Sequence, residues 1–407
     1  MTNRILIVGA GQAGGALAVK LRAEGCTDPI TLLGDEAVAP YQRPPLSKKY
    51  LLGEMEKERL LLKPETWYAE NDIELRTSEY CNSIDTAART VRLNSGESIE
   101  YARLALTTGA HPNHLPAAIG GNLQRIYTMR DIADADALSG EFEAGRHVLI
   151  VGGGYIGLEA AAVARQRGLK VTLIELSDRI LKRVACAQTA DYFRDLHTDH
   201  GVDILEGMAL ARLEGDNGSV NAALLSDGSR LAIDFVIIGI GVSPNIGIAE
   251  SAGITIDNGI AVDQYCRTSA PHVYAAGDCA SFERQGERIR LESVQNAMDQ
   301  ARVAAMNMLG HETPYAPEIR FWSDQYDVKL QIAGLAHNYD AIVSRAGRKP
   351  GSLAVFYYAG DQLQAVDAIN DPMTYVMTKK MIDAGINLPR ELAQDPDYDL
   401  KQHLTFR

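Results

Sequence analysis

The sequence is poor in cysteine, and its few cysteines lie far apart. Its 407 residues contain five, and no two of them form a C-x-x-C motif or another close pair. This spacing argues against a disulfide framework, a zinc site and an iron–sulfur cluster, so we predict no metal centre. We interpret all five as reduced thiols of a cytoplasmic protein: Cys26, Cys81, Cys186, Cys266 and Cys279.

The sequence also lacks long apolar runs and an excess of basic residues. No apolar run approaches the ~18 residues that a membrane-spanning helix needs, and the chain opens on the strand-like stretch 5–8 instead of a secretion signal. Basic residues are the minority, since 40 Lys and Arg oppose 53 Asp and Glu, which gives a net charge of −13. Such a balance disfavours general binding to nucleic acid or to anionic membranes. We therefore expect a cytoplasmic protein.

Glycine, by contrast, is placed in a repeated pattern. Residues 5–36 are similar to residues 148–178, and each copy reads as an apolar strand, a G-x-G-x-x-G turn, an Ala-rich helix and a β-branched strand ending near an acid. In this context the first glycine makes the tight turn, the second lets a pyrophosphate approach the backbone, and the third lets helix pack on strand. The sequence therefore predicts two dinucleotide-binding βαβ units: Gly9, Gly11 and Gly14 belong to the first, and Gly152, Gly154 and Gly157 to the second.

An acid at the end of the second strand of each unit is expected to bind a ribose. Glu175 lies 18 residues after Gly157, and its charge would repel a 2′-phosphate, which favours NADH over NADPH. In the first unit Asp35 or Glu36 could take the same role, and we prefer Asp35, 21 residues after Gly14. The two units imply two different dinucleotides, for which a flavin and a nicotinamide are the simplest pair.

The remaining sequence suggests how these units are divided into domains. The predicted fold class is α/β, with strand-like stretches near 101–110, 235–238 and 273–277 that continue the two units. We predict an FAD-binding domain in two segments (1–110 and 241–316), an NADH-binding domain (111–240) and a C-terminal α+β domain (317–407) with aromatic strands and a late helix near 373–384.

Further motifs carry a resemblance to a known family. Four of them resemble the signatures of the two-dinucleotide FAD/NAD(P)H disulfide-reductase fold, of the glutathione-reductase type: Gly9–Gly14, Thr107–Gly109, Gly152–Gly157 with Glu159, and Ala276–Asp278. Two more, Arg43–Lys48 and Phe321–Tyr326, resemble one branch of it, the NADH-dependent ferredoxin reductases of the putidaredoxin reductase type.

One departure from the wider superfamily bears on function. Disulfide reductases of this fold carry a redox-active cysteine pair, whereas this chain has Pro44–Lys48 where that segment would fall. The resemblance therefore implies that hydride passes from NADH to FAD and that single electrons pass to a [2Fe–2S] ferredoxin serving a cytochrome P-450 monooxygenase. A Rieske aromatic-ring dioxygenase or a rubredoxin is the alternative destination. A flavin reductase acting on a small oxidant and a NADH-sensing flavoprotein are the competing classes.

The resemblance also implies roles for individual residues. Lys48 would lie beside the flavin N5 edge and Glu159 would approach from the NADH side, which makes these two the predicted catalytic residues. The predicted FAD-binding residues are Gly9, Gly11, Ala13, Gly14, Asp35, Arg43, Lys48, Cys81, Thr108, Gly109, Arg130, Asp278, Val294 and Trp322. The predicted NAD-binding residues are Gly152, Gly154, Tyr155, Ile156, Gly157, Glu159, Glu175 and Gly241.

The net charge also constrains partner binding. Two-iron ferredoxins are usually acidic, so a chain of charge −13 needs a local basic face to dock one. The candidates are Arg345, Arg348 and Lys349 in one loop and Lys379 and Lys380 on the late helix. Whether the protein is a monomer or a homodimer stays open from the sequence.

Overall fold

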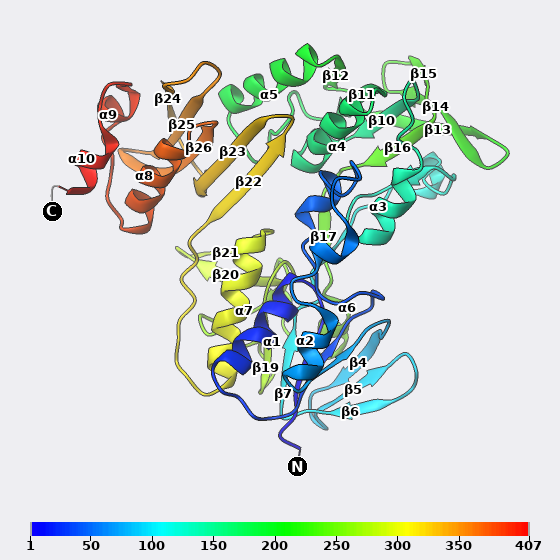
Figure 1. Cartoon of the computed structure of the whole chain (residues 1–407), viewed down its shortest axis with the longest axis vertical. Helices are drawn as coiled ribbons and strands as arrows, with labels where there is room; N and C mark the ends of the chain where they lie inside the picture. Colours follow the sequence, from blue (N-terminus) through cyan, green and yellow to red (C-terminus); the bar gives the residue numbers. More distant parts are fainter. Residues whose placement is uncertain (1, 406–407) are drawn as a thin grey trace. The chain divides into compact units, whose positions relative to one another are not determined.

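The computed structural model describes residues 2–405, which form two compact units (Figure 1). Unit 1 contains the chain up to Arg43, Glu56–His111 and Val242–Pro317; unit 2 contains Pro44–Met55, Pro112–Gly241 and the chain from Glu318 onward. The segment Pro44–Met55 thus packs with unit 2, although it lies inside the first predicted domain segment. The domain boundaries drawn from the sequence stay predictions.

Unit 1 is built on a five-stranded sheet in which every neighbouring pair is parallel. The strand order is β19 (Val273–Ala275), β7 (Arg103–Leu106), β1 (Ile5–Val8), β2 (Ile30–Leu33) and β3 (Ile73–Arg76). Strands β1 and β2 are buried along their whole length, which explains why they read as unbroken apolar runs and not as alternating ones.

Two helices pack against each other beside this sheet (Figure 1). Helix α1 (Gln12–Ala23) contributes Leu17 and Leu21 to the core, and α7 (Val294–Met308) contributes Ala301 and Ala304. Helix α7 starts at a defined point because the hydroxyl of Ser293 accepts a hydrogen bond from the Asn296 amide.

Smaller elements complete unit 1. They are η2 (Lys57–Leu60), α2 (Glu65–Glu70), β4 (Cys81–Asp85), β5 (Thr90–Leu93), β6 (Ser98–Glu100), α6 (Gly247–Ser251), β18 (Ile260–Ala261), β20 (Ala280–Arg284) and β21 (Glu287–Ile289). Strands β4–β6 form one antiparallel sheet, and β18, β20 and β21 form another three-stranded sheet. Strands β8 (Ala110–Pro112) and β17 (Val242–Pro244) pair where the chain leaves the unit and returns to it.

Unit 2 contains a second parallel sheet, in the order β12 (Val202–Glu206), β11 (Lys170–Glu175), β10 (His147–Val151), β16 (Phe235–Ile238) and β9 (Ile126–Tyr127). The helices of this part are α3 (Ile132–Ser139), α4 (Tyr155–Gln166) and α5 (Ala187–Asp199), with the short turns η1 (Pro44–Ser47) and η3 (Ala117–Ile119). An antiparallel sheet of β13 (Leu210–Asp216), β14 (Ser219–Leu225) and β15 (Arg230–Ala232) covers the face that Leu149 and Val151 present.

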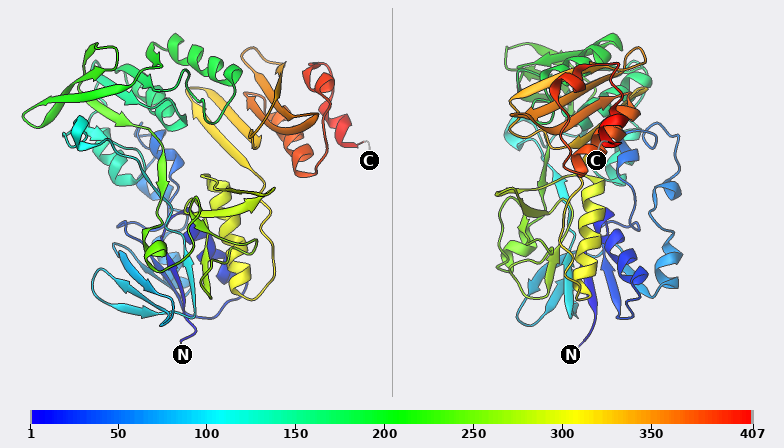
Figure 2. Two further views of the ribbon diagram at one scale, coloured as in Figure 1. Left: turned by 180° about the vertical axis from the view of Figure 1, so that it is seen from behind. Right: turned by 90° about the vertical axis from the view of Figure 1, so that its left-hand side faces the viewer.

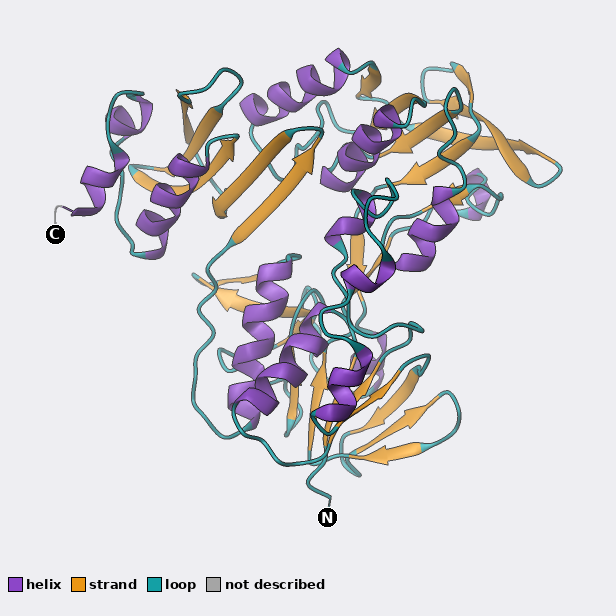
Figure 3. Ribbon diagram, viewed as in Figure 1, coloured by secondary structure: helices purple, strands orange, loops and turns teal. Residues whose placement is uncertain are grey.

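The last part of unit 2 is an antiparallel sheet followed by helices (Figure 3). Its strand order is β22 (Arg320–Gln325), β23 (Val328–Gly334), β26 (Gln362–Ile369), β25 (Leu353–Ala359) and β24 (Ala341–Ala346). Helices α8 (Pro372–Asp383), α9 (Arg390–Gln394) and α10 (Leu400–Thr405) come after β26. The late helix predicted near 373–384 is α8, and the side chain of Asp371 caps it on the amide of Thr374.

Strand β25 of this sheet is buried on both of its faces. Phe356 and Tyr358 of β25 pack with Met377 and Met381 of α8, whereas Tyr357 packs with Cys186 on the opposite face. Figure 2 shows the C-terminal helices on one side of the sheet. The period-two alternation along β25 is therefore hidden in the sequence, because both sets of side chains are apolar.

Among the helices described between residues 2 and 405, none is long and apolar enough to cross a membrane.

Candidate functional site: two dinucleotide turns and a buried ion pair

The glycine turn after β1 has the geometry that a bound dinucleotide requires. Gly9 has φ +110°, and a Cβ added there would lie 2.2 Å from the carbonyl oxygen of Thr107. A Cβ on Gly14 would lie 2.0 Å from the Gly9 oxygen, so helix α1 can approach the strand only through a glycine. At Gly11 a Cβ would meet nothing within 4 Å. The turn thus leaves open space at the N-terminus of α1, where phosphates bind.

The turn after β10 repeats this geometry within unit 2. Gly152 has φ +109°, and a Cβ there would lie 2.4 Å from the Gly239 oxygen. A Cβ on Gly157 would lie 2.1 Å from the Gly152 oxygen, whereas one on Gly154 would meet nothing within 4 Å. The two turns therefore place a close backbone contact, an open position and a second close contact in the same order.

The other predicted FAD motifs of unit 1 meet at the same end of α1. The hydroxyl of Thr107 donates to the Gly9 oxygen at 2.8 Å. Gly277 lies against the helix, since a Cβ added to it would be 3.0 Å from the Cβ of Ala13. Val294, the first residue of α7, follows the Ser293 cap. Segments that are distant in the sequence thus converge on one helix N-terminus.

The acids at the strand ends are held in different ways. Glu175 accepts hydrogen bonds from the Gly153 amide at 2.7 Å and from the Ser177 amide at 2.7 Å, so its carboxylate lies directly at the glycine turn. Glu36 is already engaged by Arg43 and by the Tyr41 hydroxyl. Asp35 is exposed at the end of β2. The contacts of Glu36 favour Asp35 as the acid available to a ribose in unit 1.

The two predicted catalytic residues form a partly buried ion pair inside unit 2. Glu159 on α4 is 3% exposed, and its Oε2 lies 2.6 Å from the Nζ of Lys48, the residue after η1. The hydroxyl of Ser47 donates to the same oxygen at 2.8 Å, and the hydroxyl of Ser323 on β22 donates to Oε1 at 2.7 Å. A buried carboxylate is costly unless it is paired and hydrogen-bonded, and three donors from two other segments meet that requirement here.

The chain matches the models of two known protein families. Residues 3–301 match the model of the family described as pyridine nucleotide-disulphide oxidoreductase, and residues 320–404 match that described as reductase C-terminal. The chain belongs to the pyridine nucleotide-disulphide oxidoreductase family. It is an oxidoreductase of the type that uses FAD and NAD(P)H, as predicted.

Similar proteins include several reductases. Rhodocoxin reductase of Rhodococcus erythropolis is 39% identical over 399 residues, which cover 98% of this chain and 93% of that protein. The crystal structure of the covalent putidaredoxin reductase–putidaredoxin complex matches with a TM-score of 0.95 and 37% identity, covering 99% of this chain and 98% of that one. The ferredoxin reductase for the CYP199A2 system of Rhodopseudomonas palustris matches with a TM-score of 0.94 and 38% identity, covering 98% and 99%.

The residues of both turns fit the cofactors of this oxidoreductase family. A pyrophosphate could approach the backbone at Gly11 and at Gly154 because neither position has a neighbouring atom in the way. Thr108 donates its hydroxyl proton to the Asn245 oxygen at 2.6 Å, and Gly109 follows with φ +68°. The predicted FAD residues are divided between the units, since Lys48, Arg130 and Trp322 belong to unit 2.

The other predicted residues have varied environments. Cys81 is buried at the start of β4, where burial raises the pKa of its thiol to about 11. Trp322 on β22 is 40% exposed, unlike an ordinary core tryptophan. On the NAD side Ile156 is exposed, Tyr155 has a buried hydroxyl without a hydrogen-bond partner, and Gly241 has φ +98°.

One predicted docking residue is wrongly assigned. Arg345 is buried, and its Nη2 donates to the carbonyl oxygens of Pro396 at 3.0 Å and Tyr398 at 2.8 Å. Burial lowers the pKa of its guanidinium from its usual value. The Arg345 guanidinium therefore binds backbone carbonyl oxygens of this chain and does not form part of a docking surface. Arg345 does not belong to the basic loop, because it lies in strand β24 with its side chain buried, whereas Arg348 and Lys349 lie in the turn after that strand.

The remaining docking candidates differ in whether carboxylates neutralise their positive charge. Lys379 lies 2.6 Å from Asp383 and 3.5 Å from Glu318, so two carboxylates already face it. Arg348, Lys349 and Lys380 are exposed.

Sequence reasoning missed four residues around the ion pair. Ser47 and Ser323 lie inside the two family motifs, and their neighbours Lys48 and Trp322 were preferred because of their chemistry. Gln325 and His197 continue the network beyond Ser323. No local pattern could have found His197, because its partner lies 128 residues away in the sequence.

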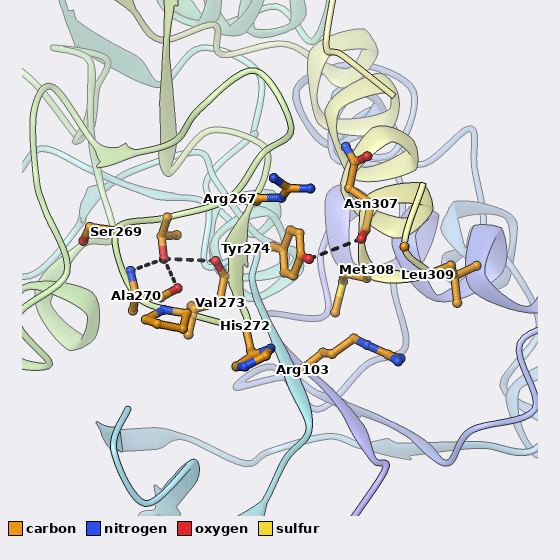
Figure 4. A pocket seen from close by; sticks show the side chains of 13 residues that line it. Arg103, Arg267, Ser269, Ala270, His272, Val273, Tyr274, Asn307, Met308 and Leu309 are labelled. Carbon is orange, nitrogen blue, oxygen red and sulfur yellow. Dashed lines mark hydrogen bonds between the residues drawn. The ribbon is translucent and has the colours of Figure 1, made fainter. Parts of the chain in front are cut away.

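Unit 1 also contains a cavity of about 520 Å³ far from these turns (Figure 4). It is lined by Arg103, His272, Tyr274 and Asn307, among others, and lies at the amino ends of β7 and β19. Parallel sheets bind their dinucleotides at the carboxyl ends of the strands. This cavity is therefore separate from the predicted FAD site.

Proposed function

We propose that the protein is an NADH-dependent ferredoxin reductase that serves a cytochrome P-450 monooxygenase system. The observation that carries the proposal is the Lys48–Glu159 ion pair, whose lysine lies in the segment where disulfide reductases of this fold have a cysteine pair. The five cysteines are all free, and the nearest two in the sequence, Cys266 and Cys279, are 13 positions apart. Electrons therefore need an acceptor outside the chain.

The chain supplies binding and orientation for this chemistry. Bound FAD would accept a hydride from NADH and release electrons singly. For FAD we assign the turn at Gly11, the Asp35 carboxylate, Thr108 with Gly109, and Asp278, to which the rest of the predicted FAD set is added. For NADH we assign the turn at Gly154, and Glu175 as the ribose acceptor.

The ion pair has two functions in this proposal. Lys48 has a positively charged Nζ atom that is only partly buried. Glu159 fixes the position of that atom through the ion pair. The pair also holds a proton on Nζ, where it is donated to Oε2 at 2.6 Å. Orientation and the position of this proton thus depend on the same short contact.

The proposed electron acceptor is inferred from the names of similar proteins. One solved relative is named for the CYP199A2 system and another is bound to putidaredoxin, which supports a two-iron ferredoxin of a P-450 system. A Rieske dioxygenase or a rubredoxin would use the same reductase chemistry. We also propose a cytoplasmic location, which the five free thiols support.

Stopped-flow spectroscopy of the FAD-loaded enzyme tests the proposal. We expect NADH to bleach the flavin absorbance within a second, and an added two-iron ferredoxin to restore it faster than oxygen does. Rubredoxin as the only effective acceptor would redirect the proposal to that carrier. A long-lived NADH–enzyme complex that no carrier discharges would contradict the reductase and favour a NADH sensor.

A further inference from the structure

A chain of buried hydrogen bonds runs from Glu159 to α5. Ser323, which donates to Glu159, lies 3.1 Å from the Nε2 of Gln325, and the Oε1 of Gln325 lies 2.7 Å from the Nε2 of His197. Gln325 and His197 are both 0% exposed. The Tyr326 hydroxyl lies 3.4 Å from the other ring nitrogen of His197. All of these residues belong to unit 2.

The ion pair dictates the direction of every bond in this chain. A carboxylate that is paired with Lys48 can only accept, so the single proton of Ser323 points to Glu159. Ser323 must then accept from Gln325, which turns the Nε2 of the amide toward Ser323 and its Oε1 toward His197. His197 must in turn carry its proton on Nε2. One ionised group therefore sets an amide orientation and a histidine tautomer.

The imidazole is suited to this fixed role because it stays neutral. Burial lowers the pKa of His197 to about 4, and the nearby His200 acts in the same direction. The other titratable groups that face the chain are Lys48 from the η1 side, Tyr155 one turn before Glu159, and Tyr326 beside the ring. A neutral imidazole offers one donor and one acceptor, as this chain requires.

We propose that Gln325 and His197 are positioning residues for the reductase reaction. They keep the Ser323 hydroxyl donating to Glu159, and thereby hold the carboxylate directed at Lys48. Without the Gln325 amide, Ser323 can turn its proton elsewhere, and Glu159 loses a donor while it remains buried. The proposal rests on the proposed function only where it concerns catalysis; the direction of the bonds follows from the ion pair alone.

The first experiment measures the tautomer directly. We would record long-range 1H–15N spectra of the holoenzyme labelled with 15N-histidine, and assign His197 from the signal that is lost in His197→Gln. The expected pattern is a neutral ring protonated at Nε2 between pH 6 and 8. A ring protonated at Nδ1, or a charged ring at pH 6, would overturn the assigned chain whatever the enzyme reduces.

The second experiment compares variants of the holoenzyme across pH. His197→Leu and Gln325→Leu remove a link, whereas His197→Gln keeps an N–H donor near the position of Nε2. We expect the two leucine variants to slow flavin reduction by NADH about tenfold, with the greater loss at the acid end of the pH profile, because Glu159 has lost a donor. His197→Gln should stay within about threefold of the parent enzyme, because its side chain still donates a hydrogen bond.

Tyr192→Phe is the matched control. The Tyr192 hydroxyl on the same helix donates to the Gly351 oxygen at 2.8 Å and has no contact with the chain from Glu159. Its loss should leave the pH profile unchanged. A pH profile of Gln325→Leu that coincides with that of Tyr192→Phe would refute the positioning role. If ferredoxin fails as an acceptor while these profiles still separate, only the proposed function fails.

Discussion

At the scale of single residues, Glu159 shows how one buried charge organises its surroundings. Glu159 lies on the Ala-rich helix α4, where the residues on both sides of it are also buried. Its carboxylate oxygens accept hydrogen bonds there because η1 and β22 each present a serine hydroxyl to them. The ion pair with Lys48 adds charge to these contacts. Removing one partner of such a pair costs more than the pair contributes, since the other charge stays buried.

Glu175 gives a testable prediction about cofactor choice. Glu175→Ala removes the carboxylate at the Gly153 amide, so we expect a higher KM for NADH and at least about tenfold less discrimination against NADPH. Steady-state kinetics with both cofactors measure this. Asp178→Asn, an exposed acid three residues later, should change neither value. An unchanged preference in Glu175→Ala would show that other groups read the ribose.

At the scale of elements, Asp367 connects β26 to α5 through a buried carboxyl. Its Oδ2 accepts from the Thr189 hydroxyl at 2.8 Å and from the Tyr357 hydroxyl. Burial raises the pKa of Asp367 to about 6, above its ordinary value of 3.8. Between these two values only the folded chain keeps the proton, so this carboxyl lowers the stability of the folded state as pH rises from about 4 to 6.

Asp367→Asn should remove this pH dependence. We expect the stability of the variant relative to the parent to rise by about 2 kcal/mol between pH 4 and pH 7, because the asparagine cannot ionise. Thermal unfolding at both pH values measures the difference. Asp361→Asn in the same hairpin, whose side chain is 97% exposed, serves as the control. An equal response of both variants would show that Asp367 does not titrate in this range.

The elements also show what the sequence could and could not predict. The two glycine turns followed from spacing, because the G-x-G-x-x-G pattern is a local requirement of strand, turn and helix. The fold class was likewise predicted, from the repeated βαβ units and the family signatures, and the late helix predicted near 373–384 is α8. The partners of Glu159 were not, since Ser323 and His197 reach it through sheet pairing and helix packing over long sequence separations. The burial of Arg345 was missed for the same reason.

At the scale of the whole molecule, a net charge of −13 must be reconciled with an acidic partner. We propose a docking surface at one or both of two exposed basic sites, Arg348 with Lys349 in the loop after β24 and Lys380 on α8. Attraction between such a surface and an acidic ferredoxin acts mainly on association and weakens with added salt.

Reversing these charges tests the docking surface. Changing Arg348, Lys349 and Lys380 to Glu together should raise the KM for ferredoxin about fivefold or more at low salt and flatten its salt dependence, because steering is lost. Flavin reduction by NADH should not change. Lys170→Glu, at an exposed residue before the β11 core, is the control. Ferredoxin kinetics equal to those of the control would exclude this surface.

The interleaving of the two units along the chain has a consequence for protein synthesis. Unit 2 takes its last segment from Glu318 onward, so α4 and α5 leave the ribosome well before the strands that share their core. Until translation ends, the nascent chain exposes the apolar side of these helices and holds Glu159 without the Ser323 hydroxyl. The growing polypeptide is therefore most vulnerable to aggregation and proteolysis in this interval. A premature stop after Pro317 would leave unit 1 fully encoded and Glu159 without its Ser323 donor.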